Sequence, residues 1–60
     1  MILKMKNSDI SLINVYNTKG LLVKTFNGIQ FLDLSGLTKG FYLIEFLQKN
    51  STIKRQFLTI

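Results

Sequence analysis

The stretch from Asp33 to Phe46, DLSGLTKGFYLIEF, joins a strand end, a corner marked by two glycines and an alternating strand without a gap. Successive side chains of a strand point to opposite faces of the sheet. The even-numbered residues from 42 to 46 therefore share one face, and the odd-numbered residues from 41 to 45 share the other. All of them are apolar or aromatic except Glu45. This alternation predicts β architecture.

The remainder of the chain repeats this pattern of short apolar runs between polar clusters. It contains no proline, and clusters of asparagine, serine, lysine and glycine separate the runs instead. Runs of this length that are rich in β-branched and aromatic residues are typical of strands. They predict strands at residues 2–5, 10–16, 21–26, 29–34, 41–48 and 52–59. Because strands spaced about eight to twelve residues apart are typical of a sandwich or barrel, we expect an all-β domain, a small β-sandwich of short antiparallel strands.

Three polar clusters predict hairpin turns. The segment from Asn17 to Gly20 ends on glycine, where a left-handed backbone costs little. Asn27-Gly28 is the strongest hairpin signal, because a type I′ turn requires positive φ at both central residues. Residues 49–51 are expected to close the last hairpin.

Leu37 lies in the middle of the glycine-marked corner, between polar neighbours. Gly36 and Gly40 discourage anything longer than one 3₁₀ turn there. We therefore expect Leu37 to turn inward and cover the end of the core.

The length allows one domain, residues 1–60, of marginal stability. Small domains often add disulfides or a metal, but the chain has no cysteine and no histidine. We therefore expect the apolar core to supply the stability. No apolar run approaches the roughly 18 residues that span a bilayer, and residues 1–6 lack the apolar stretch of a signal peptide. If the chain is exported, its signal peptide is expected upstream in a longer parent protein.

The net charge is +5, from eight lysines and arginines against three acids. Such a balance permits contact with phosphate or acidic polysaccharide. The lysines are scattered, mostly at turns and strand edges, where charge discourages edge-to-edge pairing. We favour solvated edges over a dedicated anion site.

The residues needed for catalysis are missing. General acid-base and nucleophilic chemistry need a base near neutral pKa or paired carboxylates, and the chain has no histidine and only three well-separated acids. Residues 36–40 lack the glycine spacing and the Lys-Ser/Thr ending of a phosphate loop. We expect no enzyme, no cofactor and no metal.

Aromatic residues beside lysines leave a nucleic-acid alternative open. A small basic barrel with exposed aromatics stacks and binds single strands. The aromatics here alternate with aliphatic residues as core residues do, so we read them as core and expect no nucleic-acid partner. They are Tyr16, Phe26, Phe31, Phe41 and Tyr42.

Four pieces of the sequence occur in a fixed order. Val15-Tyr16-Asn17 is followed by Gly20, then by the block LDLSGLTKGFY at residues 32–42, and last by KRQFL at residues 54–58. In this order, residues 10–59 resemble the C-terminal sorting domain of the type IX secretion system of Bacteroidetes.

The resemblance implies an immunoglobulin-like β-sandwich at the C-terminal end of a larger secreted cargo protein. The implied route is export to the periplasm, recognition by the outer-membrane translocon, and removal by a sortase-like peptidase, with the cargo ending at the cell surface or outside the cell. The Pro-Asn-Pro opening strand typical of the family is missing, which predicts truncation at the N-terminus. Thr59-Ile60 stands where a lysine-containing end is common.

The resemblance also assigns residues. Candidates for translocon recognition lie in the corner and on the last strand: Gly36, Lys39, Gly40, Lys54 and Arg55. Other motif residues are expected to serve the fold: Gly20, Asp33, Leu34, Leu37 and Tyr42.

Two further interpretations stay open. A structural or adhesive immunoglobulin-like module shares every fold-level feature of a sorting domain, so function rests on the resemblance. An exposed sheet edge also offers a contact for a homodimer.

Overall fold

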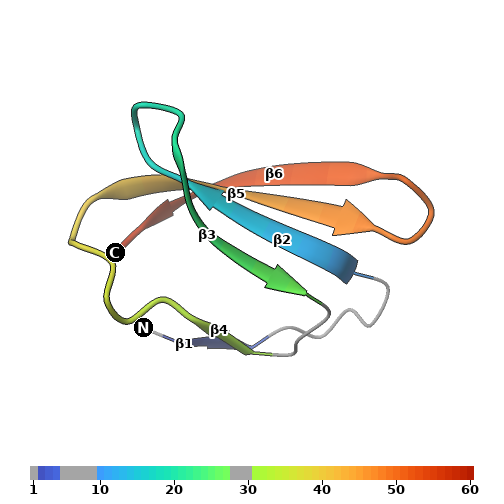
Figure 1. Cartoon of the computed structure of the whole chain (residues 1–60), viewed down its shortest axis with the longest axis horizontal. Helices are drawn as coiled ribbons and strands as arrows, with labels where there is room; N and C mark the ends of the chain where they lie inside the picture. The colour runs from blue at the N-terminus through green and yellow to red at the C-terminus, as the bar shows by residue number, and fades with distance from the viewer. Residues whose placement is uncertain (1, 5–9, 28–30) are drawn as a thin grey trace.

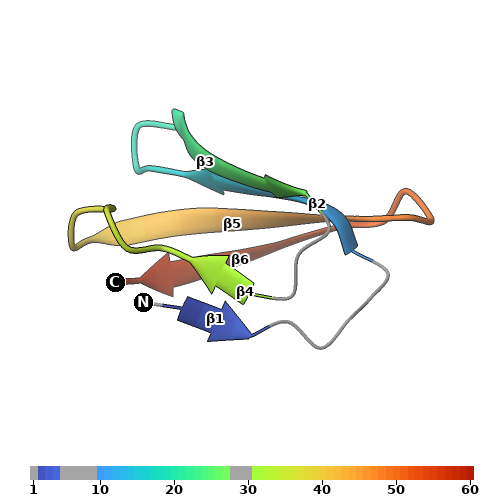
Figure 2. The ribbon, with the colours of Figure 1, turned by 60° about the horizontal axis from the view of Figure 1, so that its bottom comes forward.

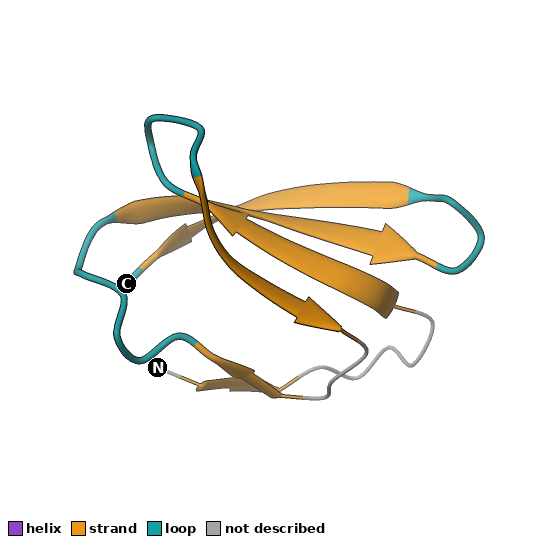
Figure 3. Cartoon of the chain, in the orientation of Figure 1, coloured by secondary structure: helices purple, strands orange, loops and turns teal. Residues whose placement is uncertain are grey.

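A computed structural model of the chain describes residues 2–4, 10–27 and 31–60, and every regular element in these ranges is a strand (Figures 1 and 3). The strands are β1 (Ile2–Lys4), β2 (Ile10–Tyr16), β3 (Leu22–Asn27), β4 (Phe31–Asp33), β5 (Phe41–Gln48) and β6 (Ile53–Thr59). Each predicted strand has a counterpart whose ends differ by at most two residues. The prediction of an all-β fold is confirmed. Among the described residues there is no helix with the length and apolarity to cross a membrane.

The strands form two sheets. The larger sheet has the order β3-β2-β5-β6, and the smaller pairs β1 with β4. All pairs are antiparallel. Figure 2 shows the small sheet as a separate layer beside the large one.

The core joins the two sheets. Four of its buried side chains come from β2 and β5, and two come from β4 and the residue after it. They are Ile13, Val15, Tyr42, Ile44, Leu32 and Leu34. The predicted alternation of β5 is confirmed, because the even-numbered positions face this core. We call this side of the large sheet its inner face and the opposite side its outer face. The immunoglobulin-like arrangement of strands stays an expectation of the family resemblance.

A bulge near the start of β2 shifts the alternation of that strand. Ile10 pairs with Gln48 and Leu12 with Leu47, so Ser11 is an extra residue in the ladder. Its Oγ donates a hydrogen bond to the Leu47 carbonyl at 3.1 Å. A bulge inserts one residue and re-aims the side chains around it. Ile10 therefore packs against the core together with Ile13, although the two are three positions apart.

The turns predicted at residues 17–20 and 49–51 are confirmed. In the β2–β3 turn, the Gly20 N–H donates to the Asn17 carbonyl at 3.0 Å. The Asn17 side-chain oxygen accepts from the N–H groups of Lys19 and Leu21, at 2.9 and 3.0 Å. In the β5–β6 turn, the N–H of Ser51 donates to the carbonyl of Gln48 at 3.0 Å.

The hairpin predicted at Asn27-Gly28 is wrong. Its flanking strands β3 and β4 belong to different sheets, so they share no ladder. The chain passes there from the large sheet to the small one, and Gly28 itself lies outside the described residues. A local turn signal does not reveal which strands pair, because pairing is decided by burial of the two faces.

Candidate recognition surface

The corner, residues 34–40 between β4 and β5, is held by its own motif residues. Asp33 Oδ1 accepts hydrogen bonds from the Ser35 hydroxyl at 2.6 Å and from the Ser35 N–H at 3.0 Å. The Tyr42 hydroxyl donates to the Thr38 carbonyl at 2.6 Å. Leu37 packs against the core, as predicted. These motif residues build the turn and attach it to the core.

The electrostatics of the corner centre on Asp33. The hydrogen bonds from Ser35, first from its hydroxyl and then from its N–H, hold the pKa of the Asp33 carboxyl below its ordinary value. The positive charge of Lys24 makes a smaller contribution in the same direction. The carboxylate therefore acts as a permanently ionised acceptor near neutral pH.

Lys24 ties the edge strand β3 to this corner. Its Nζ donates to the backbone carbonyls of Asp33 at 3.1 Å and Ser35 at 3.3 Å. The same ammonium lies 5.9 Å from the centre of the Phe26 ring, within the range of a cation–π contact. Sequence reasoning treated Lys24 as one of several scattered edge charges. Its pairing with Val15, whose side chain is fully buried, places it on the inner face.

Three of the predicted recognition residues lie together in the corner. Gly36 and Lys39 are exposed, and Gly40 follows directly. Gly36 has a φ of 95°, which favours glycine. The N–H of Gly40 donates to the Ile60 carbonyl at 3.2 Å, and the Ile60 N–H donates back at 2.9 Å. The corner is therefore joined to the residue that follows β6.

The other two predicted recognition residues lie elsewhere on β6. Lys54 pairs with Phe46 on the inner face, and Arg55 pairs with Glu45 on the outer face, because consecutive residues of a strand point to opposite sides. Arg55 lies five residues before Ile60, or about 17 Å along an extended strand. The structure thus does not gather the five candidates into one site.

A polar row crosses the outer face. Thr25 donates to the Asn14 side chain at 2.8 Å, and the Arg55 Nε donates to Glu45 Oε2 at 3.2 Å. The Tyr16 hydroxyl donates to the other oxygen of Glu45 at 3.3 Å. Glu45 is therefore held from two sides.

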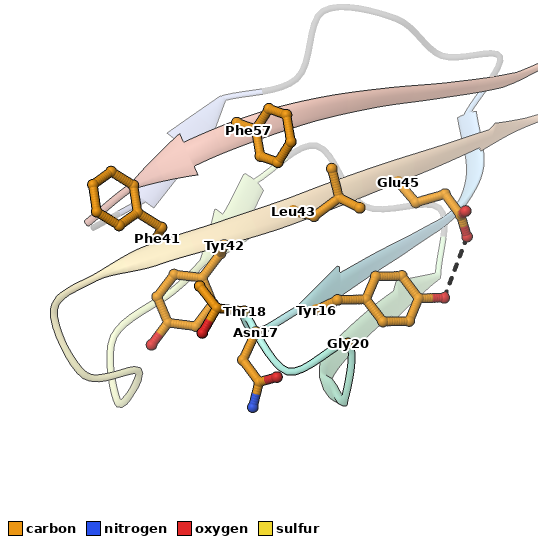
Figure 4. Close-up of a pocket in the computed structure, with 9 residues that line it drawn as sticks. All are labelled: Tyr16, Asn17, Thr18, Gly20, Phe41, Tyr42, Leu43, Glu45 and Phe57. Atoms are coloured by element: carbon orange, nitrogen blue, oxygen red, sulfur yellow. Dashed lines mark hydrogen bonds between the residues drawn. The ribbon is translucent and has the colours of Figure 1, made fainter.

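Beside this row the outer face is apolar and open. A groove of about 510 Å³, which we call the outer groove, is lined mainly by β5 and the β2–β3 turn, with one residue each from β2 and β6 (Figure 4). Its apolar walls include Tyr16, Phe41, Leu43 and Phe57. Phe41 is 66% exposed and Phe57 is 82% exposed.

The reading of the aromatics as core is therefore only partly right. Tyr42 is buried and Phe26 packs against the core, but Phe41 projects from the outer face. Phe57, which sequence reasoning did not single out, is the most exposed of the large apolar side chains in the described residues. Alternation assigns such residues to a face, but the sequence carries no signal of whether that face is covered.

The chemistry of the outer groove suits contact with another apolar surface. Glu45 is the acidic residue in its lining, and the carboxylate is already bound to Arg55 and Tyr16. None of the described residues that line the groove is a lysine or an arginine, which weighs against binding of a nucleic-acid backbone there. The described residues contain no group of three or more potential metal ligands.

Comparison with known families identifies the chain. The family model described as "Secretion system C-terminal sorting domain" matches residues 1–59. The match begins nine residues before the resemblance visible in the sequence motifs. No curated protein and no solved structure gives a significant match. Since the family model covers nearly the whole chain, this protein belongs to the family of C-terminal sorting domains of the type IX secretion system.

Proposed function

We propose that this chain is the sorting signal of a larger cargo protein, which it directs through the type IX secretion system to the cell surface or the medium. The observation that carries the proposal is the family match over residues 1–59. The partners are the cargo on its N-terminal side, the outer-membrane translocon and the sortase-like peptidase that removes the domain. The cargo passes through the periplasm on this route.

In this proposal the signal is a folded surface and not a linear tag. The corner offers Gly36, Lys39 and Gly40, and β6 offers Lys54 and Arg55. The corner lies beside the C-terminal end of β6, whereas Lys54 and Arg55 lie near the start of that strand. We therefore assign the two groups of residues to separate contacts with the machinery. The corner residues stand at the end of the sheet, and the cations stand on an open strand.

A reporter experiment tests this function. Residues 1–60 are fused behind a signal peptide and a fluorescent protein in a bacterium that has the secretion system. We expect the reporter at the surface or in the medium, and we expect it in the periplasm when the translocon gene is deleted. A matched control carries Leu34→Asp, which places a charge in the core and should unfold the domain. Periplasmic retention of the unmutated, folded domain in the wild-type strain contradicts the proposal.

The exposed aromatics of the outer face favour a second candidate, a structural or adhesive module. An apolar surface open to solvent marks contact with another molecule, and an adhesive module acts through such contacts. The same reporter separates the two functions. A folded domain that is not delivered, but that makes its carrier protein adhere to cells or to copies of itself, supports the adhesive module.

A further inference from the structure

β6 is an open edge of the large sheet. It has seven residues and pairs with β5 along one side. Within residues 2–4, 10–27 and 31–60, no strand pairs with its other side. Figure 1 shows β6 at the margin of the sheet. An edge strand presents a row of N–H and carbonyl groups that can pair with another extended chain.

The outer-face side chains of β6 form an apolar–cation–apolar row. Ile53 is 46% exposed, the Arg55 side chain is 58% exposed, and Phe57 extends the row into the outer groove. Large apolar groups on an open edge are unusual, because natural edges are normally protected by charge or by short length. The free side of β6 is therefore suited to pairing with a strand of another molecule.

The strand on the paired side shows what complements this row. On β5, Leu47 lies opposite Ile53, Glu45 opposite Arg55, and Leu43 opposite Phe57. Directly opposed side chains on one face are the pairs that stabilise a sheet, and opposite charges and apolar pairs are the favourable ones. A strand added on the free side of β6 lies opposite the same three side chains, Ile53, Arg55 and Phe57. It is therefore favoured when it presents an apolar residue, an acidic residue and an apolar residue to them.

Arg55 has the capacity to bind a second carboxylate. Its bond to Glu45 uses Nε alone among the contacts of the described residues. A guanidinium carries five N–H donors, so its terminal nitrogens can serve a carboxylate from the free side. Lys54, the next residue, is also exposed and faces the inner side. With a net charge of +5, the domain favours an acidic partner.

We propose that β6 docks an extended segment of a partner protein, which adds to the large sheet as a fifth strand. On the outer face the segment presents an apolar residue opposite Phe57, an aspartate or glutamate opposite Arg55, and an apolar residue opposite Ile53. A second acidic residue lies opposite Lys54. The inference rests on the proposed function in one respect: the segment belongs to the secretion machinery.

A second copy of the chain fits this edge less well. When two β6 strands overlap fully in antiparallel register, residue 53 lies opposite residue 59, and the two Arg55 side chains are diagonal neighbours on the same face of the sheet. Like charges that lie near each other across a strand pair destabilise the sheet. An acidic segment removes this repulsion, so the charge of the edge selects a different partner.

The direct test uses the 60-residue chain and a synthetic peptide. The peptide has the core valine-threonine-glutamate-aspartate-valine, flanked by threonines, and its control exchanges the first valine with the glutamate. We expect backbone amide shifts confined to β6 and its neighbour β5, and affinity for the control weaker by about fivefold to tenfold. Equal binding of both peptides, or shifts centred on β3, overturns the proposal. So does concentration-dependent dimerisation through β6 without peptide.

Variants then identify the side chains. Phe57→Thr keeps a strand-forming residue at an exposed position, and Arg55→Gln removes the cation. Each should weaken binding by about threefold to fivefold, because each removes one cross-strand pair. Lys49→Gln is the matched control, because it makes the same charge change in the β5–β6 turn, and it should leave affinity within about twofold. Well-dispersed amide spectra show that each variant is folded. Folded variants that bind like the unmutated chain overturn the assignment.

The reporter separates this inference from the proposed function. If the unmutated domain is delivered and Phe57→Thr reduces delivery several-fold, both stand. If Phe57→Thr is delivered as well as the unmutated domain, docking on β6 fails while the sorting function stands. If the unmutated domain is not delivered, the sorting function fails, and the peptide titration still decides whether β6 is a docking edge.

Discussion

The ammonium of Lys24 on β3 lies 3.1 Å from the backbone carbonyl oxygen of Asp33, which belongs to the other sheet. Lys24 is thus a direct link between the edge of the large sheet and the start of the corner. The same nitrogen reaches the Ser35 carbonyl at 3.3 Å. This one ammonium donates to two backbone carbonyls of the motif and so holds the corner against the large sheet.

Replacing Lys24 with methionine should loosen this link. The change keeps an unbranched apolar stem of nearly the same length and removes both hydrogen bonds. We expect the free energy of unfolding to fall by about 0.5 to 1.5 kcal/mol, because charged hydrogen bonds that are partly open to solvent contribute modestly. Urea unfolding measures this change in the free energy of unfolding. The control is Lys54→Met, since Lys54 is exposed. Equal losses in the two variants argue against a specific link.

The pKa of Asp33 makes the corner sensitive to acid. Its folded-state pKa lies below the ordinary value of 3.8. The ionised carboxylate therefore stabilises the fold fully above that value, and this contribution is lost as the pH falls through the folded pKa. Asp33→Asn keeps an acceptor oxygen but not the titration. Thermal unfolding between pH 7 and pH 2 should show a smaller acid-induced loss in the variant.

The control for this experiment is Glu45→Gln, which removes a carboxylate from the outer face instead of the corner. Its effect should be independent of the Asp33 change, since the two groups lie on different elements. An Asp33→Asn variant with the same pH dependence as the unmutated chain shows that the Ser35 hydrogen bonds do not stabilise the ionised form.

Removing the Tyr42 hydroxyl should open the corner from its other end. The ring is buried, and its hydroxyl donates to the Thr38 carbonyl at 2.6 Å. Tyr42→Phe should lower the free energy of unfolding by about 1 kcal/mol. Tyr16→Phe is the matched control and should cost less, because its bond to Glu45 is longer at 3.3 Å. Urea unfolding compares them, and a larger loss from Tyr16→Phe contradicts the assignment.

Strand positions could be predicted because they depend on local alternation. In β5, the two-residue period of apolar side chains is uninterrupted, and both ends of the strand agree with the prediction. In β3, the ladder shifts between Val15 and Tyr16, which leaves Val23 as an extra residue. A bulge of this kind has no sequence signature of its own, so it could not be foreseen that Leu22 lies on the face opposite to Lys24.

Sheet pairing and exposure could not be predicted for a different reason. Both depend on contacts between distant segments, and β4 pairs with β1 instead of the neighbouring β3. Phe41 and Phe57 look like core residues by composition, yet nothing in the described part of the chain covers them. The candidate residues of the corner were recognised through the motif. The motif also contains Tyr16, Phe41 and Phe57 of the outer groove, but it does not reveal that these residues lie side by side on an open face.

Substitutions at Gly20 test whether this motif glycine serves the fold or recognition by the secretion machinery. Its φ is 79°, and a Cβ added there meets nothing within 4 Å. The cost of Gly20→Ala is therefore backbone strain alone, about 1 to 2 kcal/mol. Gly20→Asn should cost less, because asparagine tolerates this conformation. If the glycine only serves the turn, both variants should be delivered in the reporter experiment below their unfolding temperatures. Loss of delivery by folded variants places Gly20 in a contact with the machinery instead.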